Sequence, residues 1–364
     1  MSDFCCFIIA FSVTALLLFS MKTVATYTGL VDHPNGRKCH QGDIPLIGGI
    51  AMFCGFFLAV SSLGQTGFGL RILFIGSLFL TTVGILDDLK GLSSGMRFGA
   101  QILTALVMSI QGILLQDFGM IGFGNMPVIL GIFAIPLTIF ATVGVINALN
   151  MSDGMDGLAG GLALITLISL TLAAWIAGLE LPVKILLLFI TSILAFLSFN
   201  MRLFGRQHAL VFMGNSGSLF LGFAIAWFLI SLSQGEQRAI TPVTALWIFA
   251  LPLFDTVSIM LRRILRGCSP FAADREHLHH TLLSAGFSVS QTLAIILGIA
   301  ASLAAIGLIG LYARVFEVVM FWTFLGLFAL YFFCMIRAWK VYRFLGRPLK
   351  IQLSNVVKLS HDMP

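Results

Sequence analysis

The sequence predicts an all-α, polytopic integral membrane protein, and three observations lead to this prediction. Hydrophobic residues make up 59% of the 364 residues, and charged residues make up only 10%. The mean hydropathy is +1.03. Apolar runs of about 18 or more residues, long enough to cross a bilayer as helices, recur along the chain. No internal repeat or long linker divides these runs, so we expect a single membrane domain.

The apolar runs predict about eleven transmembrane helices, separated by polar or Gly- and Pro-containing breaks. The expected helices span residues 4–21, 46–63, 70–87, 98–116, 127–149, 158–177, 183–199, 211–231, 241–261, 291–311 and 316–336. We expect the transmembrane catalytic domain to cover residues 1–336. A basic cytoplasmic tail is expected to follow over residues 337–364, where anchoring along an anionic leaflet explains the Lys and Arg residues.

The basic residues predict the orientation of the chain. The first run lacks a preceding basic residue and a small-x-small cleavage site, and Lys22 follows it. We therefore expect a retained span with its N-terminus outside. Sorting Lys and Arg onto alternate sides of the spans puts 17 of the 21 on one side, which the positive-inside rule assigns to the cytoplasm together with the C-terminus. The formal charge of +6 is thus a topology signal, and we expect no nucleic-acid partner.

Carboxylates gather on the predicted cytoplasmic side, which holds ten of the fifteen acidic residues. In the segment GILDDLKG, Asp87 and Asp88 stand at the end of an apolar span. A helix that ends at the membrane surface, with Lys90 as a local partner, would explain them. Adjacent carboxylates repel each other, however, and favour a bound divalent cation or a role as lone-pair acceptors. Both interpretations stay open for this pair taken alone.

The segment NALNMSDGMDGLAGG, residues 147–161, concentrates polar groups at the end of another span. Asn147 and Asn150 are three residues apart, as are Asp153 and Asp156, so each pair shares a face if the segment is helical. The glycines suit a loop or helix start whose backbone amides approach a ligand closely. Capping of the next helix would explain one such polar residue but not four.

Two predicted cytoplasmic loops carry residues suited to anions. The segment SPFAADREHLHH is consistent with a zinc site, a solvated polar loop or a phosphate-binding loop. Its Arg275 favours phosphate, because a planar guanidinium matches anionic oxygens and would repel a metal. The segment VDHPNGRKCHQGDIPLIGG places Lys38 and His40 after a Pro-Asn-Gly turn, either as topology-determining residues or as part of an anion-binding edge.

A further segment, NMRLFGRQHALVFMGNSGS, places Asn200 in a cytoplasmic loop and Asn215 at the entry to a span. The fragment GNSG also fits the GxSG pattern of rhomboid-type intramembrane serine proteases. Such a protease needs a histidine on a neighbouring transmembrane helix to activate the serine. All seven histidines lie in predicted loops or the tail, which argues against a protease.

One membrane face is thus predicted to hold oxygen ligands suited to Mg²⁺, a Gly-rich turn, and cations suited to phosphates. Phosphoryl transfer needs these features together, because two anions that repel each other must be positioned while charge develops between them. A membrane location indicates that one substrate is a lipid. A transporter of a phosphorylated or nucleotide-linked solute is the alternative class, but transporter sites tend to lie near the midplane rather than at one face.

Six motifs in order resemble one family. The chain is similar over essentially its whole length to the polyprenyl-phosphate N-acetylhexosamine-1-phosphate transferases. The matching motifs are GLVDHPNGRKCHQGDIPLIGG, GILDDL, NALNMSDGMDGL, FMGNSGS, TPVTALWIFALPLFD and SPFAADREHLHH. The similarity is greatest to the enterobacterial branch that uses UDP-N-acetylglucosamine and undecaprenyl phosphate, releases UMP, and primes O-antigen, enterobacterial common antigen or a related surface glycan.

The resemblance implies a multi-pass protein among the lipids of the bacterial cytoplasmic (inner) membrane, with an active site that faces the cytoplasm. It implies Mg²⁺ as the cofactor, with Mn²⁺ as an alternative. Another UDP-N-acetylhexosamine is the alternative substrate. Dimers are common in the family, so the resemblance also allows for a homodimer.

The family pattern carries candidate residues onto this sequence. The catalytic candidates are Asp87, Asp88, Asp153, Asp156 and His279. The substrate-binding candidates are Lys38, His40, Gly154, Met155, Asn200, Arg275, His277 and His280. The metal-ligand candidates are Asp88, Asn150 and Asn215. We expect the Asp87 and Asp88 pair to act through metal contact and positioning rather than as a general base. A phosphate monoester has a second pKa near ~6 and is already largely dianionic at neutral pH.

The chain departs from the family pattern at Asn215, where members carry Asp in MGDxGS. Asparagine keeps a carbonyl oxygen for a metal but removes one negative charge, so we expect weaker Mg²⁺ binding and low activity unless other ligands compensate. A second departure is Gly95, near where close relatives have a lysine. It leaves Lys90 and Arg97 as the nearby cations.

Overall fold

The computed structural model describes residues 3–33, 42–64, 69–122, 126–202, 206–269 and 277–344, with side chains up to residue 337. Within these ranges the chain is almost entirely helical, which confirms the predicted all-α class. Two short strands, β1 (Val31–Asp32) and β2 (Ile44–Pro45), pair antiparallel.

The helices account for every segment predicted to span the membrane. In chain order they are α1 (Asp3–Thr28), α2 (Gly48–Ser62), α3 (Leu70–Lys90), α4 (Ser94–Ile110), the 3-10 helix η1 (Gly131–Phe133), α5 (Ala134–Ser152), α6 (Leu158–Ile176), α7 (Glu180–Asn200), α8 (Gly214–Ser231), α9 (Pro242–Ile248), α10 (Ala250–Leu265), α11 (Leu278–Ser284), α12 (Val289–Tyr312) and α13 (Glu317–Phe344). The boundary predicted between the membrane domain and the tail falls inside α13, and residues 345–364 lie outside the described part of the chain.

The described residues form a multi-pass membrane protein. Eight of their helices are long and apolar enough to cross a membrane, and a ninth span results if α9 and α10 form one bent crossing. Helix α2 has 15 residues and α4 has 17, fewer than the ~20 residues that cross a bilayer. The total of eleven spans therefore stays a prediction, although each predicted segment is helical.

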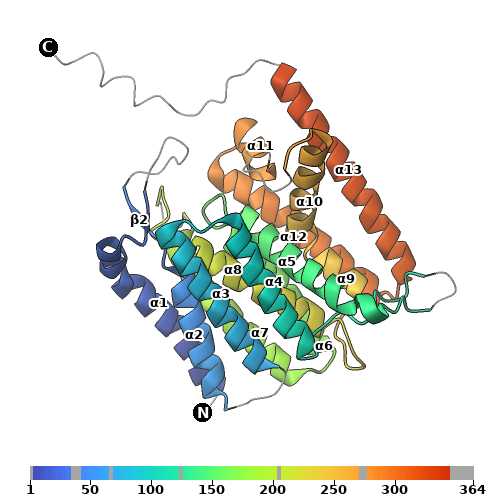
Figure 1. Ribbon diagram of the computed structural model, residues 1–364, viewed down its shortest axis with the longest axis horizontal. Coiled ribbons are helices and arrows are strands. Elements are labelled where there is room, and N and C mark those ends of the chain that lie inside the picture. Colours follow the sequence, from blue (N-terminus) through green and yellow to red (C-terminus); the bar gives the residue numbers. More distant parts are fainter. Residues whose placement is uncertain are drawn as a thin grey trace.

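The expectation of one continuous helix over residues 241–261 is wrong. Helix α9 ends at Ile248, α10 begins at Ala250, and the two axes differ by 80°. The reason is Pro252, which has no N–H to donate to the carbonyl of Ile248 and whose ring would clash with that carbonyl in a continuous helix. Proline is tolerated in the first turn of a new helix, so the break falls just before it. Helix α10 then continues to the upper end of the bundle (Figure 1).

Helix α8 is the centre of the bundle and packs against α2, α3 and α5. In its most apolar stretch, 89% of the residues are buried. Glycines make the crossings close: Gly49 of α2 lies against Gly217, and Gly84 of α3 lies against the backbone of Ser216. Lipid supplies no hydrophobic force between helices, so small residues that let backbones approach closely are what stabilise such crossings. The GNSGS segment is thereby fixed between three helices.

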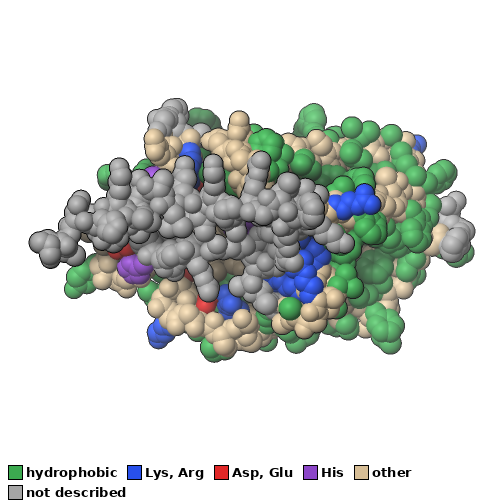
Figure 2. Space-filling model, turned by 90° about the horizontal axis from the view of Figure 1, so that it is seen from above, with side chains coloured by type: hydrophobic (Ala, Val, Ile, Leu, Met, Phe, Trp, Pro, Cys, Tyr) green, Lys and Arg blue, Asp and Glu red, His purple; other side chains and the backbone are tan. Residues whose placement is uncertain are grey.

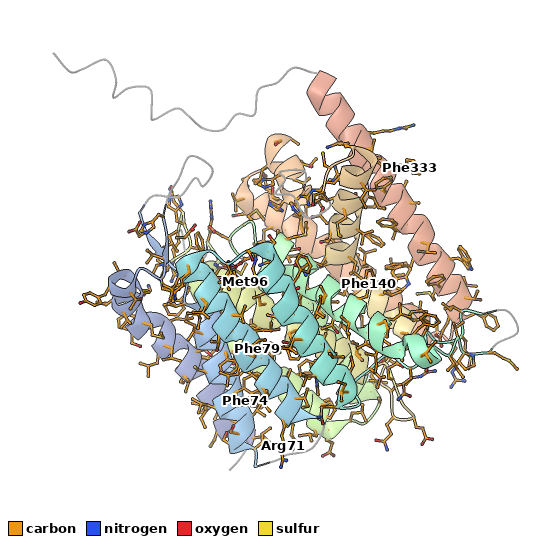
Figure 3. All side chains as sticks on the ribbon, viewed as in Figure 1. Arg71, Phe74, Phe79, Met96, Phe140 and Phe333 are labelled. Atoms are coloured by element: carbon orange, nitrogen blue, oxygen red, sulfur yellow. The ribbon has the colours of Figure 1, made fainter. Side chains whose placement is uncertain are left out.

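The two ends of the bundle differ in character. The N-terminus lies at the lower end in Figure 1, whereas the strands, α11 and the end of α13 lie at the upper end. Arg71, predicted to lie on the outer side, is at the lower end, and Phe74, Phe140 and Phe333 are exposed on the flanks as lipid-facing side chains are (Figure 3). Seen from above in Figure 2, basic, acidic and histidine side chains gather on the upper end. That end holds the candidate site.

Candidate active site

The carboxylate of Asp88 joins the end of α3 to the start of α8. Its Oδ1 accepts a hydrogen bond from the backbone N–H of Asn215 at 3.0 Å, and its Oδ2 accepts one from the N–H of Ser216 at 3.3 Å. N–H groups in a first helical turn have no partner within their own helix, so Asp88 caps α8 from outside. Gly214, with a φ of 72°, leaves space for this, since a Cβ there would lie 2.7 Å from the carboxylate.

Asn150, near the end of α5, meets Asn215 at the same junction. The Asn150 Nδ2 donates to Oδ1 of Asn215 at 3.1 Å and to the hydroxyl of Ser218 at 2.7 Å. The structure thus brings together, from three helices, the three residues predicted as metal ligands. Ser218 was not predicted, because the motif spacing did not indicate that its hydroxyl faces α5.

The oxygen atoms at this junction suit a hard divalent cation. The set contains the carboxylate of Asp88 and the carboxamides of Asn150 and Asn215, which are ligand types that Mg²⁺ prefers. Within the described ranges, no group of three His, Cys, Asp or Glu side chains is placed to hold a metal. Among the three predicted metal ligands, Asp88 contributes the carboxylate, and the two asparagines contribute neutral oxygens.

Asp87 forms hydrogen bonds with different residues from those that Asp88 contacts. Its carboxylate is buried and accepts hydrogen bonds from the N–H of Leu92 at 2.8 Å and from the guanidinium of Arg97 at 3.1 Å. Lys90, the local partner considered from the sequence, is exposed. Arg97 therefore neutralises Asp87, and the pair fixes the turn between α3 and α4.

The loop between α5 and α6 is held in place by Asn200. The Oδ1 of Asn200 accepts the N–H of Gly157 at 2.8 Å, and its Nδ2 donates to the carbonyl of Val211 at 2.9 Å. Both ends of this buried amide are thus bonded to main chain. These bonds hold the loop, and the expected contact of Asn200 with substrate stays a prediction. The sequence did not reveal this role, because the bonded residues lie far apart in sequence and no local motif links them.

Acidic side chains accumulate around this loop. Asp153 and Asp156 lie in a turn rather than on a helix face, and Asp156 accepts a hydrogen bond from Nε of Arg202 at 2.8 Å. The pKa of Asp153 is raised to about 7 by desolvation and by the like charges of Asp88 and Asp156. The Asp153 side chain is exposed to solvent, close enough to Asp88 and Asp156 to be affected by their like charges. They favour a cation at this end of the bundle.

His279 lies against the loop with its ring buried. A Cβ at Gly154 would lie 2.5 Å from the Nε2 of His279, so the absence of a side chain at Gly154 makes this approach possible. Desolvation, and then the charges of His280 and His277, lower the pKa of His279 to about 3, which keeps the imidazole neutral at physiological pH. Its buried Nε2 has no hydrogen-bond partner among the described residues. This nitrogen is suited to bonding a ligand.

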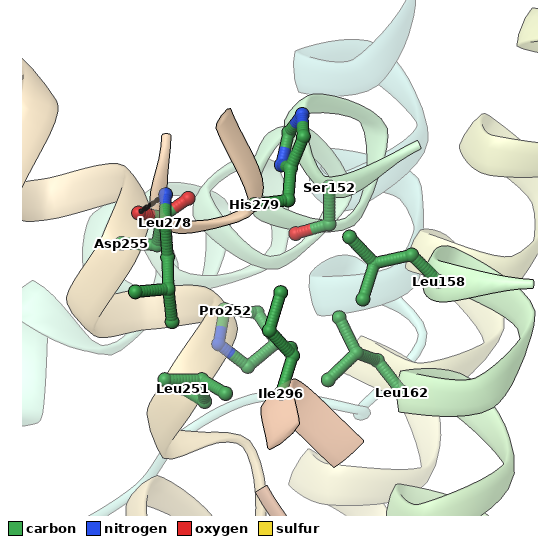
Figure 4. Close-up of a pocket in the computed structure, with 9 residues that line it drawn as sticks. All are labelled: Ser152, Leu158, Leu162, Leu251, Pro252, Asp255, Leu278, His279 and Ile296. Carbon is green, nitrogen blue, oxygen red and sulfur yellow. Dashed lines mark hydrogen bonds between the residues drawn. The ribbon is translucent and has the colours of Figure 1, made fainter. Parts of the chain in front are cut away.

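A small cavity adjoins His279 on the side of the apolar core (Figure 4). Its lining consists of Ser152, Leu158, Leu162, Leu251, Pro252, Asp255, Leu278, His279 and Ile296. Most of these side chains are apolar, and no cationic side chain is among them. A diphosphate needs cations or several hydrogen-bond donors, so the lining of this cavity does not suit one.

The predicted histidines form one cluster. The ring centroid of His279 is 5.5 Å from that of His277 and 4.2 Å from that of His280. His277 Nδ1 lies 2.7 Å from the Oδ2 of Asp255 on α10. No role was predicted for Asp255 from the sequence, because 22 residues separate it from His277.

Four predicted contacts are not placed at the site by the structure. Lys38, His40 and Arg275 lie outside the described residues. Met155 is partly buried and packs against an apolar cluster formed by α6, α9, α10, α12 and α13. Its expected contact with a nucleotide stays a prediction.

Comparison with known proteins identifies relatives that match over nearly the whole chain. The undecaprenyl-phosphate alpha-N-acetylglucosaminyl 1-phosphate transferase of Escherichia coli (strain K12) is 41% identical over 347 residues, which cover 93% of this chain and 92% of the relative. The chain belongs to the polyprenyl-phosphate N-acetylhexosamine-1-phosphate transferase family. Proteins of the same name from Yersinia pestis and Haemophilus influenzae are 40% and 39% identical, cover 95% and 91% of this chain, and are each covered over 94% of their own length.

Membership in this transferase family confirms the resemblance carried by the six motifs. A family model described as Glycosyl transferase family 4 matches residues 70–233. This range contains Asp88, Asn150 and Asn215, whereas Asp255 and the histidine cluster lie beyond it and are covered by the longer matches to the transferases.

Proposed function

We propose that the chain transfers N-acetylglucosamine 1-phosphate from UDP-N-acetylglucosamine to undecaprenyl phosphate and releases UMP. The lipid-linked product would prime O-antigen, enterobacterial common antigen or a related glycan. The observation that carries this proposal is the meeting of Asp88, Asn150 and Asn215, from three helices, at one end of a membrane bundle. The names of the relatives, which match over nearly the whole chain, support the choice of substrates.

The reaction exchanges one P–O bond for another. An oxygen of the lipid phosphate attacks the phosphorus atom that carries the sugar. The bond from that phosphorus to the oxygen of the UMP phosphate breaks, and UMP leaves with the bonding electron pair. Both reactants are anions, so the protein contributes mainly by positioning them and by placing positive charge near the reacting oxygens.

Asp88, Asn150 and Asn215 would hold Mg²⁺, with Mn²⁺ as the alternative, because carboxylate and carboxamide oxygens suit hard divalent cations. The bound cation would supply positive charge to the diphosphate oxygens. The protein prepares this set before substrate arrives: Asp88 fixes the first turn of α8, and Asn150 fixes the side chain of Asn215.

The loop between α5 and α6 and the histidine cluster would bind the nucleotide sugar. The backbone at Gly154 is open to close approach, and Asp156 is held by Arg202. The unpartnered Nε2 of His279 would hydrogen-bond the diphosphate or the sugar. Arg275, His277 and His280 belong to the same segment of the sequence and would contribute further contacts.

Asp88 is proposed to position groups rather than to remove a proton. We expect the Asp88→Asn enzyme to be strongly impaired at neutral pH and to stay impaired as the pH rises to 9, because the lipid phosphate is already dianionic above a pKa of ~6. The pH profile of kcat for both enzymes checks this. A strong recovery of the variant at high pH would show that deprotonation of the lipid phosphate matters.

The upper end of the bundle is proposed to face the cytoplasm of a bacterium, with the chain in the inner membrane. Nucleotide sugars are cytoplasmic, and the positive-inside rule supports this orientation. Undecaprenyl phosphate would reach the site from the surrounding membrane lipids. A homodimer is the assembly we propose for testing by cross-linking in the membrane.

The test is a panel of UDP-sugars incubated with the purified chain, undecaprenyl phosphate and Mg²⁺ in detergent, with product identification by mass spectrometry. We expect UMP and a lipid diphosphate carrying N-acetylglucosamine. A preference for UDP-N-acetylgalactosamine or another UDP-N-acetylhexosamine would change the substrate but keep the reaction. A transporter would release no UMP from any member of the panel.

A further inference from the structure

Asp255, on α10, is the hub of a buried hydrogen-bond network behind the histidine cluster. Its Oδ2 lies 2.7 Å from Nδ1 of His277. Its Oδ1 accepts the backbone N–H of Leu278 at 3.0 Å and the hydroxyl of Tyr331 at 2.9 Å. Asp255 and His277 are 8% and 6% exposed, so these bonds form where water competes little and where their loss would leave buried polar groups unpaired.

The network fixes both the ring of His277 and the helix that follows it. An ionised carboxylate only accepts hydrogen bonds, so the Nδ1 of His277 must carry the proton and the Nε2 is left for another partner. No partner for that Nε2 occurs among the described side chains and backbone groups. Leu278 is the first residue of α11, whose N-cap residue His277 makes no side-chain cap bond. Asp255 therefore supplies the cap.

Tyr331 brings the last helix of the chain into the network. Helix α13 contacts α9, α10 and α11, and only 11% of its apolar stretch is buried. The Tyr331 ring packs 5.9 Å from the ring of Phe254, which places its hydroxyl on Asp255. A phenylalanine at this position would keep the ring packing and would lose only the hydrogen bond.

We propose that Asp255 and Tyr331 are positioning residues for the transferase reaction: Tyr331 holds Asp255, and Asp255 sets the tautomer and orientation of His277 and the start of α11. The proposal rests on the proposed function. In it, the Nε2 of His277 faces the diphosphate of the nucleotide sugar, and His279 keeps its place against Gly154 because α11 is capped. Neither Asp255 nor Tyr331 touches the substrate.

The test compares Tyr331→Phe and Asp255→Asn with the parent enzyme in steady-state assays. Tyr331→Phe is expected to lower kcat about tenfold, the effect of one hydrogen bond to a charged group, with the KM for UDP-N-acetylglucosamine changed less than about twofold. Asp255→Asn presents an amide N–H to Nδ1 and is expected to lower kcat roughly 100-fold, as loss of a supporting partner does at other histidine sites. The double variant should be no worse than Asp255→Asn, because both changes act on one network.

Hydrogen–deuterium exchange gives a readout that does not depend on activity. In Tyr331→Phe, uptake should rise in the peptide that contains residues 277–284 and stay unchanged in α8. Tyr312→Phe is the matched control, since Tyr312 is exposed at the end of α12. This control should have the same kcat and the same deuterium uptake as the parent.

Two results would overturn the proposal. One is a Tyr331→Phe enzyme with the kcat and deuterium uptake of Tyr312→Phe, and the other is increased uptake throughout the bundle, which would indicate general destabilisation. If the parent chain releases no UMP, the proposed function fails instead. The exchange comparison then still decides whether Tyr331 and Asp255 hold α11.

Discussion

Asn215 is the residue whose chemistry distinguishes this chain most from its family pattern. Its side chain already receives a hydrogen bond from Asn150, and an aspartate oxygen could accept the same bond. The substitution Asn215→Asp would therefore add a negative charge to the proposed metal site and keep the contact with Asn150. We expect Mg²⁺ to bind on the order of tenfold more tightly, because affinity for a hard cation rises with ligand charge.

The measurement is activity as a function of Mg²⁺ concentration for the parent and for Asn215→Asp, including saturating Mg²⁺. The matched control is Asn147→Asp, which makes the same change one helical turn before Asn150, where the amide donates to Gln101 at 2.6 Å. The control should bring no gain. An Asn215→Asp enzyme that gains nothing at any Mg²⁺ concentration would contradict a metal site at this residue.

Gly154 is predicted to be intolerant of a side chain. In Gly154→Ala the added Cβ would meet Nε2 of His279 at 2.5 Å, so the loop or the imidazole must move. A displacement of about 1 Å in a catalytic constellation can cost about 100-fold in rate, and we expect a loss in kcat/KM of that order. Gly144→Ala is the control, because a Cβ there has no neighbour within 4 Å. Equal activity of the two variants would show that the contact is unimportant.

At the scale of helices, the close crossing of α3 and α8 determines where Asp88 meets Asn215. A Cβ at Gly84 would collide with the backbone of Ser216. We expect Gly84→Ala to destabilise the bundle by about 1–3 kcal/mol, as overpacking does, and to lower activity by separating Asp88 from α8. Thermal unfolding in detergent measures the first effect.

Gly99→Ala provides the comparison for that experiment. Gly99 lies within α4, and a Cβ there has no neighbour within 4 Å. Alanine is a better helix former than glycine, so this variant should be as stable as the parent or slightly more stable. If Gly84→Ala unfolds at the same temperature as Gly99→Ala, the crossing is not as tight as its geometry implies.

The helices were predicted better from the sequence than any other feature. One error, the missed break between α9 and α10, has a clear cause. Long apolar runs predicted the membrane helices because hydrophobicity over ~20 residues is a local property. The break between α9 and α10 was missed because Pro252 lies inside an apolar run that satisfies the same criterion. A proline near the middle of a predicted span was the signal that could have located it.

For the site, too, local features were predicted from the sequence and contacts between distant residues were not. Asp88, Asn150, Asn215 and His279 were predicted because their motifs resemble those of a known family. The networks that hold them were not, because the partners of a hub such as Asp255 are 22 to 76 residues away in sequence. Tyr331 stands in an apolar helix whose pattern gives no sign that one hydroxyl faces the site.

For the whole molecule, orientation in the membrane is the next prediction. Cys5 and Cys268 are exposed near opposite ends of the bundle, and the positive-inside rule places only Cys268 in the cytoplasm. In variants that retain a single cysteine, a membrane-impermeant maleimide should label Cys5 in intact spheroplasts. It should label Cys268 only after permeabilisation. The reverse pattern would show that the site end faces outward.

The central claim is that this bundle joins a nucleotide sugar to a membrane lipid. The most direct measurement is the amount of UMP released from UDP-N-acetylglucosamine by the purified chain, with and without undecaprenyl phosphate, at saturating Mg²⁺. We predict UMP and lipid-linked N-acetylglucosamine phosphate in equal amounts, and neither product when the lipid is omitted. UMP release that is independent of the lipid, or no release at all from the parent and from Asn215→Asp, would contradict the account.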